Sequence, residues 1–261
     1  MPFPLAAIGY GSIVGLSLGL TGSGGSILAI PLLVYGLGMP LSQAIVVSLL
    51  MVATIALFGA ARQSFSKNVD WRAAILFSLS GVIVSPIVIQ LAYDVDDKLR
   101  LLLFAGLMLI VAFRMGFGRP QIPSGHAPSQ ARSLSGAIKI IGGGAVAGAL
   151  SGFFGVGGGF VIVPLLTMIF NMPYRVAVGT SLASISLISI AAVSGAFMKG
   201  ITVDWSLFAG FVAGGALGML AGSAFVNKIP DHLAKMIFAA VISALGIFML
   251  IEKLYLNQGA L

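Results

Sequence analysis

Two glycine clusters interrupt long apolar stretches of the chain, and their residue types could form a binding site. They are Gly22-Ser23-Gly24-Gly25 and Gly155-Val156-Gly157-Gly158-Gly159. Glycine permits unusual dihedral angles and close approach of a ligand. The segments that follow, starting near Ser26 and Phe160, would point the positive N-termini of helices toward the breaks. Two such ends that meet near the middle of a membrane would make an anion site.

Hydroxyl groups near both clusters could donate hydrogen bonds to an oxyanion. Ser48 and Ser181 carry the most weight because they occupy equivalent places in two similar halves of the chain. Gln43 and Arg175 could guard an entrance, although Arg175 is also suited to snorkelling to lipid headgroups. The full set of candidate substrate-binding residues is Thr21, Gly22, Ser23, Gly24, Gly25, Ser26, Ser48, Gly155, Val156, Gly157, Gly158, Gly159, Thr180 and Ser181.

An alternative interpretation keeps both clusters purely structural. They would then be tight turns of packed hairpins, and each hydroxyl would bond the backbone of its own helix. Neither cluster fits a nucleotide fingerprint, because neither follows a strand or carries the lysine of a P-loop.

The ionisable residues exclude most enzymes. All seven acids lie at the ends of apolar segments, and both histidines lie in or beside loops. A proton relay, a carboxylate cation site, a hydrolase or a metalloenzyme would need such groups inside the membrane. We therefore expect no catalytic residues, no metal and no cofactor, and an anionic cargo would meet no buried like charge.

The composition predicts an all-α polytopic membrane protein. Of 261 residues, 59% are hydrophobic and 8% are charged, whereas about a quarter are charged in a soluble domain. The formal charge of +7 comes from basic residues that fall singly, so nucleic acid is not an expected partner. Cysteine is absent, which excludes disulfides and thiolate metal sites. No Lys or Arg precedes the first apolar segment, so we expect it to be retained rather than cleaved as a signal.

Eight apolar regions must position these residues. A bilayer core of about 30 Å needs about 20 helical residues, and six uninterrupted runs meet that length. The two regions at 5–37 and 134–170 contain the glycine clusters and are predicted to be helical hairpins. The six uninterrupted runs are 41–61, 72–93, 98–117, 174–198, 205–226 and 231–251.

The chain repeats itself at an offset of 133, which rises by one residue in its later part. Six glycines of the first hairpin align with six of the second, as do Pro31 with Pro164 and Ser48 with Ser181. We therefore predict a first repeat at 1–117, a polar linker at 118–133 and a second repeat at 134–261. Two similar halves, each with a glycine-interrupted segment, are typical of secondary transporters that bind substrate between the repeats.

Basic residues give a weak indication of topology. With a cytoplasmic linker, and hairpins that return to their own side, ten Lys and Arg residues lie inside and both termini lie outside. Each half then makes an odd number of crossings, so the repeats would be inverted. The rival topology has hairpins that cross once and leaves nine basic residues inside. The exceptions to the first arrangement are Lys98, Arg100, Lys199 and Lys253.

Glycines four residues apart form faces on three predicted helices, and close helix packing explains them best. The faces are Gly11, Gly15 and Gly19; Gly144, Gly148 and Gly152; and Gly210, Gly214, Gly218 and Gly222.

The two hairpins resemble the glycine-proline signature of the TauE/SafE sulfite exporter family. The resemblance lies in residues 19–26 with Pro31 and residues 152–159 with Pro164, and it extends over both halves. It implies a plasma membrane permease for small sulfur-containing anions such as sulfite or organosulfonates. The two blocks differ at Ser23 against Val156 and at Ser26 against Gly159, so the site is expected to be asymmetric.

Together these features predict a multi-pass carrier of the inner cell membrane that exports a small sulfur-containing anion. The alternatives are an anion channel, which would use the same helix dipoles, and a membrane assembly subunit that transports nothing. The expected partners are the lipid bilayer and the anionic substrate. The identity of the anion, a coupling ion and assembly into a homo-oligomer are left open.

Overall fold

The computed structural model describes residues 3–21, 24–117, 134–169, 172–201, 203–225 and 231–255. Within these ranges the regular structure is helical and there is no strand. The long helices are α1 (Phe3–Thr21), α3 (Leu41–Phe65), α4 (Trp71–Ala92), α5 (Asp97–Phe117), α6 (Leu134–Phe154), α8 (Tyr174–Phe197), α9 (Trp205–Phe225) and α10 (Asp231–Tyr255). The short elements are η1 (Gly24–Leu28), α2 (Ala29–Pro31), η2 (Leu32–Gly36) and α7 (Gly159–Ile169).

The six uninterrupted apolar runs are confirmed as helices, namely α3, α4, α5, α8, α9 and α10. Four of the described helices, α3, α4, α8 and α9, are long and apolar enough to cross a bilayer. Large apolar side chains such as Leu79, Ile83 and Leu217 project outward and are more than half exposed. An apolar exterior of this kind suits a lipid environment. The chain is thus an α-helical membrane protein.

Both predicted hairpins contain a long helix and a second helical segment. In the second hairpin, α6 is followed by four non-helical residues and then by α7. The returning arm of the first hairpin differs from the expected single α-helix. It consists of the 3-10 helix η1, one turn of α-helix and the π-helix η2. Gly25 of η1 is in direct contact with the backbone of Leu18, an approach that a tighter helical turn allows.

Helices α3 and α8 form the centre of the bundle and run antiparallel. Most of their side chains are buried, from Leu41 to Ala60 on α3 and from Ala177 to Ala196 on α8. Near the start of α8, the hydroxyl of Thr180 accepts a 2.9 Å hydrogen bond from the backbone N–H of Asp70, which follows α3. The start of one central helix therefore lies beside the end of the other.

The glycine faces pack helices from different halves against each other. Gly15 on α1 touches the backbone of Gly215 on α9, and a Cβ at Gly148 on α6 would lie 2.6 Å from Gly81 on α4. Successive glycines along one helix meet successive residues along its partner in the same order. The two helices of each pair are therefore parallel. Where a described glycine of the three predicted faces meets another helix, it contacts the backbone of that helix. This confirms the predicted packing role.

The main helix pairs join one sequence half to the other, and most of them occur in equivalent versions. The pair α1 and α9 corresponds to α6 and α4, since α1 aligns with α6 and α9 with α4. Two further main contacts join helices that are equivalent to each other, α3 with α8 and α5 with α10, and a third joins α4 with α8, whose counterpart is the smaller contact of α9 with α3. The bundle is therefore assembled between the sequence halves rather than within each one.

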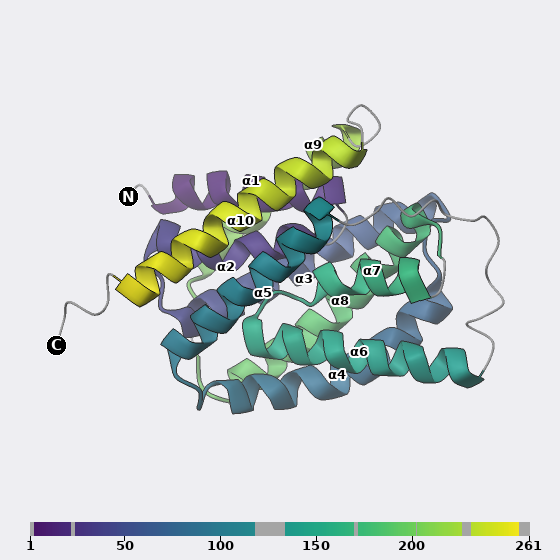
Figure 1. Ribbon diagram of the computed structural model, residues 1–261, viewed down its shortest axis with the longest axis horizontal. Coiled ribbons are helices and arrows are strands. Elements are labelled where there is room, and N and C mark those ends of the chain that lie inside the picture. Colours follow the sequence, from purple (N-terminus) through teal and green to yellow (C-terminus); the bar gives the residue numbers. More distant parts are fainter. Residues whose placement is uncertain are drawn as a thin grey trace.

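The two ends of the described chain lie at the same end of the bundle. Figure 1 shows the first turn of α1 and the last turn of α10 at the left, whereas α6 starts at the right.

An ion pair of 3.6 Å joins Lys199, after α8, to Asp94, after α4. The ends of α4 and α8 therefore share one end of the bundle.

Candidate functional site

The second glycine break is a tight turn between α6 and α7. Gly155, Gly157 and Gly158 have φ values of +74°, +70° and +68°, a conformation that side chains other than glycine rarely adopt. The N–H of Gly155 donates to Ser151 at 2.8 Å, and the N–H of Val161 donates to Gly158 at 3.1 Å. These bonds hold both ends of the turn, and the residues between them are buried.

The turn lies between the two central helices. A Cβ at Gly155 would come within 2.8 Å of Ile45 on α3, and a Cβ at Gly157 would lie 2.9 Å from the Ser189 hydroxyl on α8. Val52 on α3 is equally close to Gly157. Side chains at these glycines would therefore meet neighbours from both halves, and the backbone itself faces the centre of the bundle.

Ser48 ties the first half of the sequence to this break. Its buried hydroxyl donates a 2.8 Å hydrogen bond to the carbonyl oxygen of Gly155. The equivalent Ser181 is also buried, but its hydroxyl donates to Val178 on its own helix at 2.8 Å. The repeated serines thus occupy matching places on α3 and α8 and make different contacts.

The first break is only partly described. Gly22 and Ser23 lie outside the described residues, and η1 begins at Gly24. Thr21 donates to Ser17 of its own helix at 2.7 Å, and Ser26 is fully buried. The arm that starts at η1 also contacts α7, so the returning segments of the two hairpins meet.

The remaining predicted residues lie in the second turn and on α3 and α8. Val156 and Gly159 are buried in and directly after the second turn. Thr180 is buried near the start of α8, where it accepts the backbone N–H of Asp70 at 2.9 Å. Of the two entrance candidates, Gln43 is half-buried on α3 and Arg175 is exposed on α8.

Arg100, on the first turn of α5, is a further candidate. From the sequence it was counted only among the basic residues that indicate topology. Its side chain is 2% exposed, and its Nη2 donates a 2.8 Å hydrogen bond to the carbonyl oxygen of Phe153, two residues before the break. The guanidinium carbon lies 5.6 Å from the ring centre of Tyr93 and 5.7 Å from that of Phe153. Asp97, whose side chain is 60% exposed, lies 3.9 Å from Nη1.

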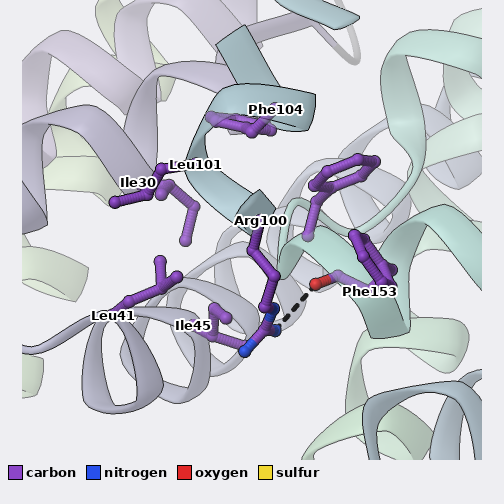
Figure 2. A pocket seen from close by; sticks show the side chains of 8 residues that line it. Ile30, Leu41, Ile45, Arg100, Leu101, Phe104 and Phe153 are labelled. Atoms are coloured by element: carbon purple, nitrogen blue, oxygen red, sulfur yellow. Dashed lines mark hydrogen bonds between the residues drawn. The ribbon is translucent and has the colours of Figure 1, made fainter. Parts of the chain in front are cut away.

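Arg100 lines a small, partly open cavity next to the break. Figure 2 shows its side chain among Leu41, Ile45 and Phe153, with the hydrogen bond to the Phe153 carbonyl drawn as a dashed line. The other lining residues are apolar. They are Ile30, Leu41, Ile45, Leu101, Phe104, Phe153 and Phe154.

Several buried polar atoms in this region have no hydrogen-bond partner among the described residues. They include Nε and Nη1 of Arg100 and the hydroxyls of Tyr93, Ser151 and Ser189. Burial raises the pKa of the Tyr93 hydroxyl to about 12, so it stays protonated and can donate. Buried polar groups are normally satisfied, so such a group indicates a place for a ligand or ordered water.

The sequence does contain a signal for Arg100. Its counterpart in the second half, at the offset of 134 that holds there, is Ala234, so the charge interrupts the repeat. The charge is thus present at only one of two equivalent positions, and the burial of Arg100 makes this difference informative. Among the described residues, no group of three His, Asp or Glu side chains could hold a metal ion.

Comparison with known proteins gives one family. The family model described as sulfite exporter TauE/SafE matches residues 7–249. A probable membrane transporter protein of Xylella fastidiosa (strain 9a5c) is 33% identical over 249 residues, which cover 94% of each chain. A probable membrane transporter protein of Methanocaldococcus jannaschii is 28% identical over 95% of each chain. No solved structure matches the chain. The chain therefore belongs to the TauE/SafE sulfite exporter family and is a membrane transporter.

Proposed function

We propose that this transporter is a secondary carrier that exports small sulfur-containing anions, such as sulfite or organosulfonates, across the inner cell membrane. The observation that carries the proposal is the position of the second glycine break. It lies between the central helices α3 and α8, and Ser48 of one sequence half bonds Gly155 of the other. The name of the family supplies the class of substrate.

The backbone of the break suits an oxyanion. The first N–H groups of a helix have no partner within the helix, and α7 begins at Gly159, directly after the turn. The helix dipole adds about half a positive charge at that end. Backbone N–H groups from Val156 to Gly159 would bind the anion, with Ser48 and Ser189 nearby as hydroxyl groups. The first break, from Thr21 to Ser26, would complete the site from the other half.

We assign the two repeats to 1–117 and 134–261, joined by the linker 118–133, and we assign them inverted orientations. The equivalent helices α3 and α8 run antiparallel, and the reciprocal contacts of α1 with α9 and of α6 with α4 fit a twofold relation. A twofold axis that reverses α3 onto α8 lies in the membrane plane. Movement of one half against the other would then expose the same site to each side in turn.

Cysteine labelling tests this orientation directly, because the chain contains no cysteine of its own. Lys67 follows α3 and Ile201 follows α8, and they are equivalent positions of the two halves. We expect Lys67→Cys and Ile201→Cys to react with a membrane-impermeant maleimide from opposite sides of oriented vesicles. Reaction of both from the same side would exclude inverted repeats.

Transport in proteoliposomes tests the function. We expect saturable uptake of labelled sulfite or ethanesulfonate, and exchange of labelled for unlabelled anion across the membrane. Gly157→Val should abolish this flux because its side chain would meet Ser189 and Val52, whereas Gly200→Val is a control with a similar φ and open space around it. Equal flux in both variants would exclude the proposed site.

The same vesicles separate the alternatives. Flux that does not saturate and shows no exchange would indicate an anion channel, and no flux at all would indicate an assembly subunit. The packing of the glycine faces inside the chain argues against an assembly subunit, because α1 and α9 cover each other, as do α4 and α6. Flux that changes with the cation in the buffer would identify a coupling ion.

A further inference from the structure

We infer that Arg100 forms the charged part of a subsite that binds one small monovalent oxyanion beside the second glycine break. The inference rests on the proposed function, since it places the anion of that carrier in a particular cavity. It adds a residue from α5 to a site that the sequence ascribes to the hairpins and to the central helices.

The first argument is the cost of burying a charge. A buried guanidinium is stabilised only when it is paired and its N–H groups are bonded. Arg100 is 2% exposed, yet Nε and Nη1 have no hydrogen-bond partner among the described residues. Those N–H groups are available to an anion, which would satisfy both the charge and the donors.

The protein's own contacts account for only part of the Arg100 side chain. Nη2 is used by the carbonyl oxygen of Phe153, and the rings of Tyr93 and Phe153 face the guanidinium. Asp97 is 3.9 Å away with a mostly exposed side chain, so solvent screens this pair. These contacts hold the guanidinium in place and leave Nε and Nη1 without a hydrogen bond.

The second argument is the cavity itself. It is small and partly open, and Arg100 is its one charged lining residue among otherwise apolar side chains. A single positive charge in an apolar wall matches a small anion with one negative charge, because a second negative charge would stay unpaired. The ring of Tyr93, 5.6 Å from the guanidinium carbon, supports Arg100 from outside the cavity lining.

The third argument is the position of the cavity. Phe153 and Phe154 form its wall and end α6 directly before Gly155, and Ile45 both lines the cavity and touches Gly155. An anion held by Arg100 would therefore lie at the start of the turn that leads to α7. The position equivalent to Arg100 in the second half is Ala234, so the repeat does not duplicate this arginine.

Anion binding to Arg100→Gln tests the inference, with Lys98→Gln as the matched control. Both changes remove one positive charge from the first turn of α5, but Lys98 is exposed. We would measure the thermal midpoint of the purified protein against increasing ethanesulfonate and sulfite, with sulfate as a divalent comparison. We expect Arg100→Gln to weaken binding by roughly tenfold to a hundredfold, since bonds to a charged group are lost. Lys98→Gln should bind as the natural protein does.

A second pair of variants leaves the charge in place, in case Arg100→Gln does not fold. Leu101→Phe enlarges a buried side chain that lines the cavity, whereas Leu99→Phe enlarges one that is 48% exposed on the same helix turn. We expect only Leu101→Phe to reduce the anion-induced shift of the midpoint. A normal shift in folded Arg100→Gln, or in Leu101→Phe, would overturn the subsite.

The binding and transport experiments distinguish failure of the subsite from failure of the proposed carrier function. If the natural protein transports the anion while Arg100→Gln keeps full affinity, the subsite is wrong and the carrier stands. If the natural protein binds anions through Arg100 but vesicles show no flux, the subsite stands and the carrier is wrong. No midpoint shift with any of these anions would overturn the subsite.

Discussion

Gly158 provides a sharp test of the second break, because both its conformation and a backbone contact exclude a side chain there. Its φ is +68°, and a Cβ would lie 2.5 Å from the carbonyl oxygen of Ala147 on α6. Gly200, in the turn after α8, has a φ of +74° and nothing within 4 Å of the same position. Gly158→Ala and Gly200→Ala therefore share the conformational strain and differ in the steric contact.

The expected magnitudes follow from these two terms. The left-handed conformation costs a residue with a side chain about 1 to 2 kcal/mol, and this applies to both variants. Forcing extra volume into a packed site costs about 1 to 3 kcal/mol more, and backbone at Ala147 cannot rotate away as a side chain could. We expect Gly200→Ala to lose about 1 to 2 kcal/mol of unfolding free energy. Gly158→Ala should lose about 2 to 5 kcal/mol.

Reversible unfolding in mixed detergent micelles would measure the difference. The chain has two tryptophans, Trp71 and Trp205, at the starts of α4 and α9, and their fluorescence reports on the bundle. The strain common to both variants cancels, so the steric contact alone should separate them by about 1 to 3 kcal/mol. A separation below about 0.5 kcal/mol, the usual error of additivity, would refute the tight turn described between α6 and α7.

Three further predictions concern other contacts, and each is tested by the same unfolding measurement. Ser48→Ala should cost about 1 to 3 kcal/mol because it removes the bond to the break, and Ser181→Ala should cost less because its bond stays within one helix. Gly144→Ala should destabilise the protein because its Cβ would strike the backbone of α4, whereas Gly142→Ala, in open space on the same helix, should stabilise it by up to about 1 kcal/mol. Asp70→Ala should cost about 1 kcal/mol, since the carboxylate caps α4 by accepting the N–H of Ala73 at 3.0 Å. Equal unfolding free energies within the serine or the glycine pair, or no loss on removing the cap, would contradict the contact concerned.

Much of the secondary structure could be predicted from the sequence because a lipid bilayer imposes a length and an apolar composition on each helix. The six uninterrupted runs and the break at Gly155–Gly159 lie where these constraints place them. The arm after Gly24 was predicted less well. Its 3-10 turn brings Gly25 against the backbone of α1, which is a contact between segments and has no local pattern.

The sequence by itself determined the helices, the repeat and the membrane environment, since each follows from spacing and composition along the chain. Only the tertiary structure decided which helices meet, because a glycine face shows that a close partner exists but does not identify it. The structure pairs α1 with α9 and α6 with α4 across the sequence halves. It also decided the environment of Arg100, which the sequence presents as one more basic residue near a helix end. Burial is a property of the surroundings, and residues far apart in the chain, Ile45, Arg100 and Phe153, form this cavity only when α3, α5 and α6 come together.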